Sequence, residues 1–220
     1  MKVVQRHDTW FDFVWALIRV LYYFIALPSL LFIAAATLVG MFGKTMLHAD
    51  GQFYLFSLFV WLAILFPLGV RHYGKVCRRR VLNQIVTMLT RPDRFNPQKQ
   101  HQVMDAGRGK YLGIDTKNGN ILYIHMVKKG VIDVVGLDMR SWTNRELEGS
   151  ALRLNTRMPD VPVLSVTAHP IVAKELFNTL GAMNHNRYTE PFPQEPWPLY
   201  VAHQSNFVEY EHNVVVPQAV

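Results

Sequence analysis

The chain has 220 residues, half of them apolar, and a formal net charge of +7 from 23 Lys and Arg against 16 Asp and Glu. Two stretches of at least 20 residues without a charged side chain exclude a wholly soluble enzyme, a coiled coil and a disordered chain. The single cysteine, Cys77, excludes an intramolecular disulfide framework and fits a reducing cytoplasm.

The two uncharged stretches are long enough to cross a membrane. Val20 to Gly43 comprises 24 residues and Gly51 to Val70 comprises 20 residues, all without Asp, Glu, Lys, Arg or His. A helix that rises about 1.5 Å per residue needs about 20 apolar residues to cross a hydrocarbon core of about 30 Å. We therefore predict a membrane anchor in residues 1–70, with transmembrane helices over about 17–43 and 51–70.

Prolines and small residues inside these stretches have local interpretations. Pro28 and Pro67 are expected to kink the helices, and the pair Ala36 and Gly40 allows close contact between helices. Ala34-Ala35-Ala36 is similar to the cleavage site of a signal peptide. Because the apolar stretch continues to Gly43 and a second span follows, an anchor is favoured over a cleaved signal peptide.

The positive charge is concentrated after the second span. Residues 71–99 carry a net charge of +7, whereas residues 1–70 carry +1 and residues 100–220 carry −1. Basic residues beside membrane spans stay in the cytoplasm, so both termini are predicted to be cytoplasmic and Lys44–Asp50 to be an exoplasmic turn. The side chains expected to contact the membrane surface are those of Arg71, Lys75, Arg78, Arg79 and Arg80.

Residues 71–99 are predicted to form a juxtamembrane linker with an amphipathic helix. Apolar residues from Val81 to Leu89 recur at helical spacing, and the helix should end near Arg91-Pro92 because a residue before proline avoids helical geometry. The apolar face of this helix would lie on lipid or on the following domain. Nucleic-acid binding is disfavoured, since the basic residues lack interleaved aromatic residues and adjoin the membrane.

From Lys110 the apolar pattern indicates strands. Asn118-Gly119 separates two strand-like runs and predicts a hairpin with a type I′ turn. The short runs rich in branched and aromatic residues are 111–116, 121–127, 131–137, 141–146, 151–155 and 161–167. We expect an antiparallel meander or small barrel, which together with one helix forms an α+β domain over residues 100–186.

A helix and a tail complete the chain. Pro170 is expected to begin an amphipathic helix that caps the sheet at its C-terminal end. Residues 187–220 are predicted to be a Pro-rich extended tail, in which residues 206–216 add a final edge strand.

No catalytic, cofactor or metal-binding pattern is present in the sequence. The nine histidines include no pair at i, i+4, and no nucleophile elbow or phosphate-binding loop occurs. Asp115, Asp133 and Asp138 are expected to cap turns or lie at the surface. Trp142 and Trp197 are candidate aromatic anchors, either in a core or in contact with a partner. The prediction is therefore a protein that is not an enzyme and uses no cofactor or metal.

The segments YLGIDTKNGNILYI, DVVGLDMRSW and LRLNT, the PVLSV strand and the AKELFNTL helix resemble the bacterial PH-like domains found near membranes. The resemblance covers about residues 105–185 and implies an antiparallel barrel or sheet closed by one C-terminal helix. The expected fold is a membrane protein with two N-terminal transmembrane helices and a PH-like cytoplasmic α+β domain.

The whole layout of two spans, a basic linker and this domain resembles the ExcA-type entry-exclusion proteins of I-complex conjugative plasmids. The resemblance implies a bacterial inner-membrane protein that blocks redundant plasmid transfer by recognising an integral-membrane protein of the donor's mating apparatus. The implied partners are the lipid bilayer and that donor protein, and a homo-oligomer is left open. The alternative is a membrane-tethered PH-like scaffold of a secretion or envelope complex.

Overall fold

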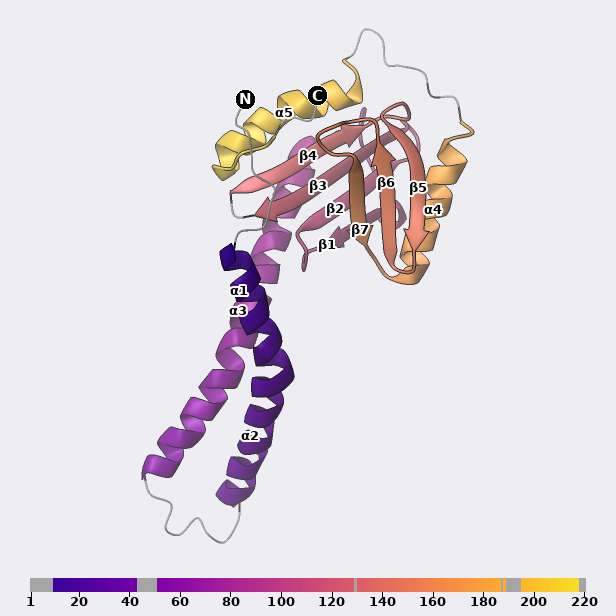
Figure 1. Ribbon diagram of the computed structural model, residues 1–220. Helices are drawn as coiled ribbons and strands as arrows, with labels where there is room; N and C mark the ends of the chain where they lie inside the picture. The colour runs from indigo at the N-terminus through magenta and orange to yellow at the C-terminus, as the bar shows by residue number, and fades with distance from the viewer. Residues whose placement is uncertain (1–9, 43–50, 129, 187, 189–194, 218–220) are drawn as a thin grey trace. The chain divides into compact units, whose positions relative to one another are not determined.

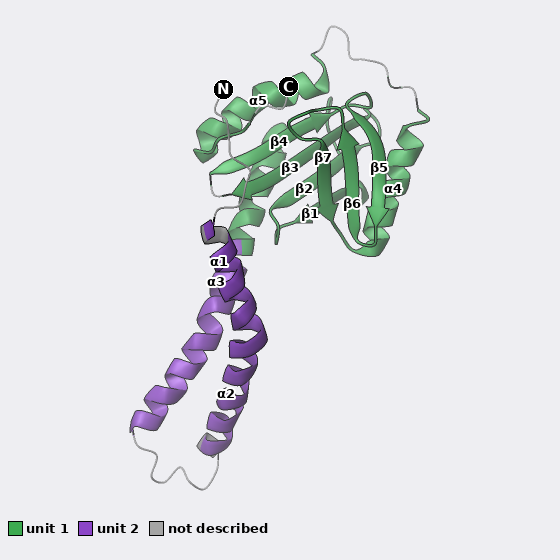
Figure 2. Ribbon diagram, viewed as in Figure 1, with its two compact units in different colours: residues 1–4, 75–220 green, residues 5–74 purple. Residues whose placement is uncertain are grey.

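A computed structural model describes residues 10–42, 51–128, 130–186, 188 and 195–217. The described residues divide into two compact units (Figure 2), a helical unit up to residue 74 and a domain from residue 75 onward. Helix α3 (Gly51–Leu89) contributes residues to both units. The predicted turn at Lys44–Asp50 and the prolines at 191 and 193 lie outside the described residues.

The first predicted span is helical from residue 10 to residue 42. Its three consecutive segments are α1 (Trp10–Leu21), the π-helix η1 (Tyr22–Ala26) and α2 (Leu27–Phe42). The π-helix comes shortly before Pro28, which has no N–H to donate to the carbonyl of Phe24 and whose ring crowds that carbonyl. The wider turn accommodates the proline, so Pro28 alters the helix locally without ending it.

Within the helical unit, small and branched side chains pack between α2 and the first half of α3. The buried positions are Ala34, Thr37, Ser57, Val60 and Ile64. They recur every three or four residues, which is the spacing of residues that face one neighbouring helix. Of the predicted Ala36–Gly40 pair, only Gly40 lies close to the opposite helix, at the ring of Phe53, whereas Ala36 is exposed.

Helix α3 runs without a break over 39 residues. The second predicted span and the predicted linker helix are therefore one helix, and Pro67 lies inside it without ending it. At its C-terminal end, Leu82, Ile85 and Leu89 are fully buried in a core of the domain. The apolar face that the sequence assigned to lipid or to the domain thus packs on the domain.

The described residues of the domain form two antiparallel sheets (Figure 1), with strand orders β1-β2-β3-β4 and β5-β6-β7. All six predicted strand runs are found to within two residues at each end, and β1 is an additional strand outside those runs. The strands of the first sheet are β1 (Gln102–Asp105), β2 (Lys110–Asp115), β3 (Asn120–Lys128) and β4 (Val131–Leu137). Those of the second sheet are β5 (Trp142–Glu148), β6 (Ala151–Thr156) and β7 (Val163–Thr167).

The predicted hairpin at Asn118-Gly119 is confirmed, but its turn differs from the expected one. Asp115 pairs with Asn120, which leaves four residues in the loop, and of these only Gly119 has a positive φ, at 73°. The turn is therefore not type I′. The carboxylate of Asp115 accepts hydrogen bonds from the backbone N–H groups of Lys117 and Asn118, and this capping favours the longer loop.

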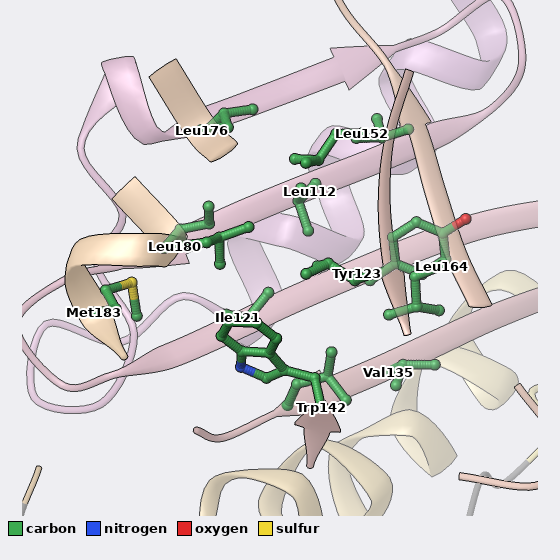
Figure 3. Packing of buried hydrophobic residues seen from close by; sticks show 14 of the residues in the cluster. Leu112, Ile121, Tyr123, Val135, Trp142, Leu152, Leu164, Leu176, Leu180 and Met183 are labelled. Atoms are coloured by element: carbon green, nitrogen blue, oxygen red, sulfur yellow. The ribbon is translucent and has the colours of Figure 1, made fainter. Parts of the chain in front are cut away.

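The first face of the four-stranded sheet packs on the three-stranded sheet and on α4 (Pro170–Met183). Figure 3 shows side chains from both sheets and α4 meeting in this core, Leu112, Tyr123, Val135, Leu164 and Leu176 among them. Pro170 lies in the first turn of α4, as predicted. On β6 the exposed Arg153 separates the buried Leu152 and Leu154, so the three-stranded sheet keeps the exposed face that the alternation predicts.

The second face of the four-stranded sheet is buried as well. Tyr111, Ile124 and Val134 alternate with the residues of the first core and pack against the end of α3 and against α5 (Trp197–His212). The prediction of a sheet covered by a single C-terminal helix is therefore incomplete, because α3 and α5 together cover the opposite face (Figure 1).

Helix α5 replaces the predicted extended tail and edge strand. Pro198 lies in its first turn, where a missing N–H breaks no helical hydrogen bond. Its buried positions are Trp197, Tyr200, Val201, Ser205 and Val208. Among the described residues of this tail, Val215, which lies beyond the end of the helix, pairs with a strand through an isolated parallel bridge to Val131.

Candidate anchor, basic segment and recognition face

The helical unit presents large apolar side chains on its outer surface. Two helical segments, Phe13–Gly40 and Gly51–Leu89, are long and apolar enough to cross a membrane. Side chains such as Phe24, Phe32 and Phe66 are 79%, 79% and 71% exposed. A soluble domain buries most of such residues, whereas a membrane span presents them to lipid.

The five basic residues of the predicted membrane-surface contact all lie on α3. They are Arg71, Lys75, Arg78, Arg79 and Arg80, and we call them the basic segment. Arg78 is half-buried and the other four are exposed. At about 100° per residue, the first four share one side of the helix and Arg80 lies on the opposite side. The guanidinium of Arg71 lies 5.0 Å from the ring centroid of Tyr23, a cation–π distance.

The structure places both candidate tryptophans inside the domain, each 4% exposed. Trp142 lies in the core between the two sheets (Figure 3). Trp197 anchors α5: its ring stacks on Phe95 with centroids 5.0 Å apart, and its Nε1–H donates to the carbonyl of Ile121 at 2.9 Å. Of the two alternatives for these residues, the structure supports the core, because side chains so enclosed offer almost no surface to a partner.

Two of the three aspartates singled out in the sequence make structural contacts in turns. Asp115 caps the hairpin loop, and Asp138 accepts hydrogen bonds from the backbone N–H of Arg140 and from the hydroxyl of Ser141. Asp133 is buried within β4, where no turn needs a cap, so the prediction of a turn or surface role is wrong for this residue. Within the described residues, no group of three potential metal ligands occurs.

Polar contacts also join the two sheets. The Nζ of Lys110 donates at 2.8 Å to both the carbonyl and the hydroxyl oxygen of Ser165 on β7. Burial lowers the pKa of Lys110, and the neighbouring Arg108 lowers it further. The hydroxyl of Tyr123 donates to the same carbonyl at 3.2 Å, and burial raises the pKa of this phenol. These hydrogen bonds join the inner strands β2 and β3 of the first sheet to β7 of the second.

Helix α5 carries an exposed apolar face that was not predicted from the sequence. Leu199, Phe207 and Tyr210 are 53%, 62% and 91% exposed. Because an α-helix turns by about 100° per residue, these three side chains lie within about 80° of one another around the helix axis. We call them the α5 face. The signal that could have revealed it is the helical recurrence of apolar residues from Trp197 to Val208, after a proline suited to a first turn.

These features define a class of protein: an apolar pair of helices continuous with an antiparallel α+β domain, with a basic segment along the connecting helix. The chain belongs to the exclusion-determining protein family, whose model matches residues 1–220. This membership supports the expectation of an entry-exclusion protein. No curated protein and no solved structure matches the chain.

Proposed function

We propose that the protein is an ExcA-type entry-exclusion protein of the bacterial inner membrane, which blocks redundant conjugative transfer of a plasmid into a cell that already carries it. The observation that carries the proposal is the family match over the whole chain. The two apolar helices support membrane insertion, because each is long enough to span and exposes apolar side chains on its outer surface.

The basic segment orients the protein in this proposal. Arg71, Lys75, Arg79 and Arg80 directly follow the second span, and such residues stay on the cytoplasmic side next to anionic lipid headgroups. Both termini and the domain are then cytoplasmic.

The orientation is tested with reporters fused to the C-terminus. A green fluorescent protein fusion should fluoresce, and an alkaline phosphatase fusion should be inactive, because that enzyme matures only outside the cytoplasm. Replacing Arg71, Lys75, Arg79 and Arg80 together by Gln should lower fluorescence and raise phosphatase activity, because each basic residue near the surface contributes about 1 kcal/mol of attraction. Active phosphatase on the unaltered chain would contradict the orientation.

The domain acts in this proposal as a PH-like recognition module without enzymatic activity. Four-stranded and three-stranded antiparallel sheets followed by α4 support the PH-like assignment. The proposed partner is an integral-membrane protein of the donor's mating apparatus. The α5 face supports a protein partner, since exposed apolar side chains gathered on one helix face are a common feature of interaction sites.

A mating assay tests the function. Recipient cells that express the full chain should yield at least several-fold fewer transconjugants with the cognate plasmid than cells that carry the empty vector. The same expression should leave the transfer of an unrelated plasmid unchanged. An unchanged frequency with the cognate plasmid, at verified expression in the membrane fraction, would refute the proposal.

The recognition face is tested separately. The double variant Phe207→Ser/Tyr210→Ser should lose exclusion while the protein level stays the same. Ile171→Ser on α4 removes a side chain of similar exposure, 71%, and should keep exclusion. If both variants exclude normally, the α5 face is not the recognition surface, although the function assigned to the full chain stands.

A further inference from the structure

A pair of arginines follows α3 on a tight, well-anchored turn. Arg91 and Phe95 form an antiparallel bridge, in which the Phe95 N–H donates to the Arg91 carbonyl at 2.8 Å and the Arg91 N–H to the Phe95 carbonyl at 3.0 Å. Phe95 is fully buried. The carbonyl of Arg94 accepts hydrogen bonds from the side-chain amides of Asn118 and Asn120 at 3.2 and 2.9 Å. The turn is thus held by the core and by the β2–β3 hairpin.

Both guanidinium groups lie against one ring of α5. The central carbon of Arg94 is 4.6 Å from the ring centroid of Tyr200, and that of Arg91 is 5.6 Å from it. Stacking on the ring uses the face of a guanidinium and leaves the N–H groups at its edge free to donate. Tyr200 in turn stacks on Trp197. The ring of Tyr200 is therefore held in the core, and the two guanidinium groups gather on it before any ligand binds.

Two polar atoms at this position have no hydrogen-bond partner among the described residues. The Nη1 atom of Arg94 is buried without a hydrogen bond, and so is the hydroxyl of Tyr200, a residue that is only 7% exposed. Within the described ranges, neither Arg91 nor Arg94 forms an ion pair with a carboxylate. Buried polar groups are nearly always satisfied, so these two unsatisfied atoms beside two arginines without an ion-pair partner point to a bound anion.

We propose that Arg91, Arg94 and Tyr200 form a binding site for a phosphate group. Arginine guanidinium groups pair with phosphate oxygens through two parallel N–H···O bonds, and the phenol hydroxyl adds a further donor, so the three side chains suit a phosphate. The phosphate is either free inorganic phosphate or the phosphodiester of a lipid headgroup. Because the arginines lie in the turn after α3 and the tyrosine lies on α5, the bound group joins α5 to that turn.

Thermal unfolding of the detergent-solubilised full chain tests the site. Inorganic phosphate and glycerophosphoglycerol, a soluble headgroup diester, are each titrated against chloride at matched ionic strength. A ligand that binds the folded state raises the midpoint in a saturable way. A shift with the diester identifies the headgroup as the ligand, and a shift with inorganic phosphate alone identifies the free ion. If neither shifts the midpoint beyond chloride, the proposal is overturned.

Variants assign the effect to these residues. Arg94→Gln and Arg91→Gln should each weaken the apparent affinity about tenfold or more, and Tyr200→Phe, which keeps the ring, by a smaller factor. Arg157→Gln removes the same charge from an exposed position elsewhere in the domain and should bind like the parent. Arg91 is exposed, so its variant tests the site without disturbing the core. An unaltered response of both arginine variants would overturn the proposal.

Discussion

Replacement of Trp197 by Ala is expected to lower the free energy of unfolding of the domain by about 3–5 kcal/mol. The indole is 4% exposed, stacks on Phe95 and Tyr200, and donates to the Ile121 carbonyl. Alanine would leave a cavity against the four-stranded sheet and an unpaired carbonyl. Denaturant titration of the solubilised chain measures the loss, and hydrogen exchange should show that the α5 amides lose protection first.

Two variants separate the contributions of this side chain. Trp197→Phe keeps an aromatic ring but lacks the N–H donor, so a smaller loss of about 1–2 kcal/mol is expected. Leu199→Ala lies on the same helix but is 53% exposed, and its effect should stay within about 0.5 kcal/mol. Equal losses for Trp197→Ala and Leu199→Ala would mean that α5 is not docked through Trp197.

Replacement of Asp115 by Ala is expected to destabilise the domain by about 3 kcal/mol, since it removes several partly buried hydrogen bonds to a charged group, each of which contributes about 1.5–3 kcal/mol at most. The carboxylate is 2% exposed. It accepts from the backbone N–H groups of Asn96, Lys117 and Asn118 at 3.0, 2.9 and 3.4 Å, and from the Asn118 side chain at 2.9 Å. Denaturant titration measures the loss, and hydrogen exchange should be fastest in the 116–119 loop.

The conservative variant and a surface control complete this test. Asp115→Asn keeps one acceptor oxygen but brings an amide group toward the remaining donors, so about half of the loss is expected. Glu175→Ala removes an exposed carboxylate from α4 and should change stability by less than about 0.5 kcal/mol. A loss for Glu175→Ala as large as that for Asp115→Ala would show that the capping contacts are not the cause.

Most of the local elements could be predicted because their signals lie within short segments. The apolar stretches, the strand runs from Tyr111 to Thr167 and the helix at Pro170 each have their own periodicity. Strand β1 could not be found in this way, since its four half-buried residues carry no run of branched side chains. The prolines around α5 suggested an extended chain, but Pro198 lies where a helix tolerates it.

The candidate site was predictable only in part. The basic segment is visible in the sequence as a local excess of charge, and the structure leaves four of its five side chains exposed. The α5 face depended on recognising α5 as a helix. The grouping of Arg91, Arg94 and Tyr200 brings together residues more than 100 positions apart, and no local pattern indicates which of the arginines will meet an aromatic ring.

By itself the sequence determined that the protein has two apolar helices, a basic segment and an antiparallel α+β domain, because hydrophobic period and charge are properties of neighbouring residues. Only the tertiary structure decided what covers the second face of the four-stranded sheet. Ile85 of α3 and Val201 of α5 come from opposite ends of the domain's sequence and meet in one core with Ile124. Which helices cover this face depends on the simultaneous burial of apolar surfaces from several segments, and no single segment contains that information.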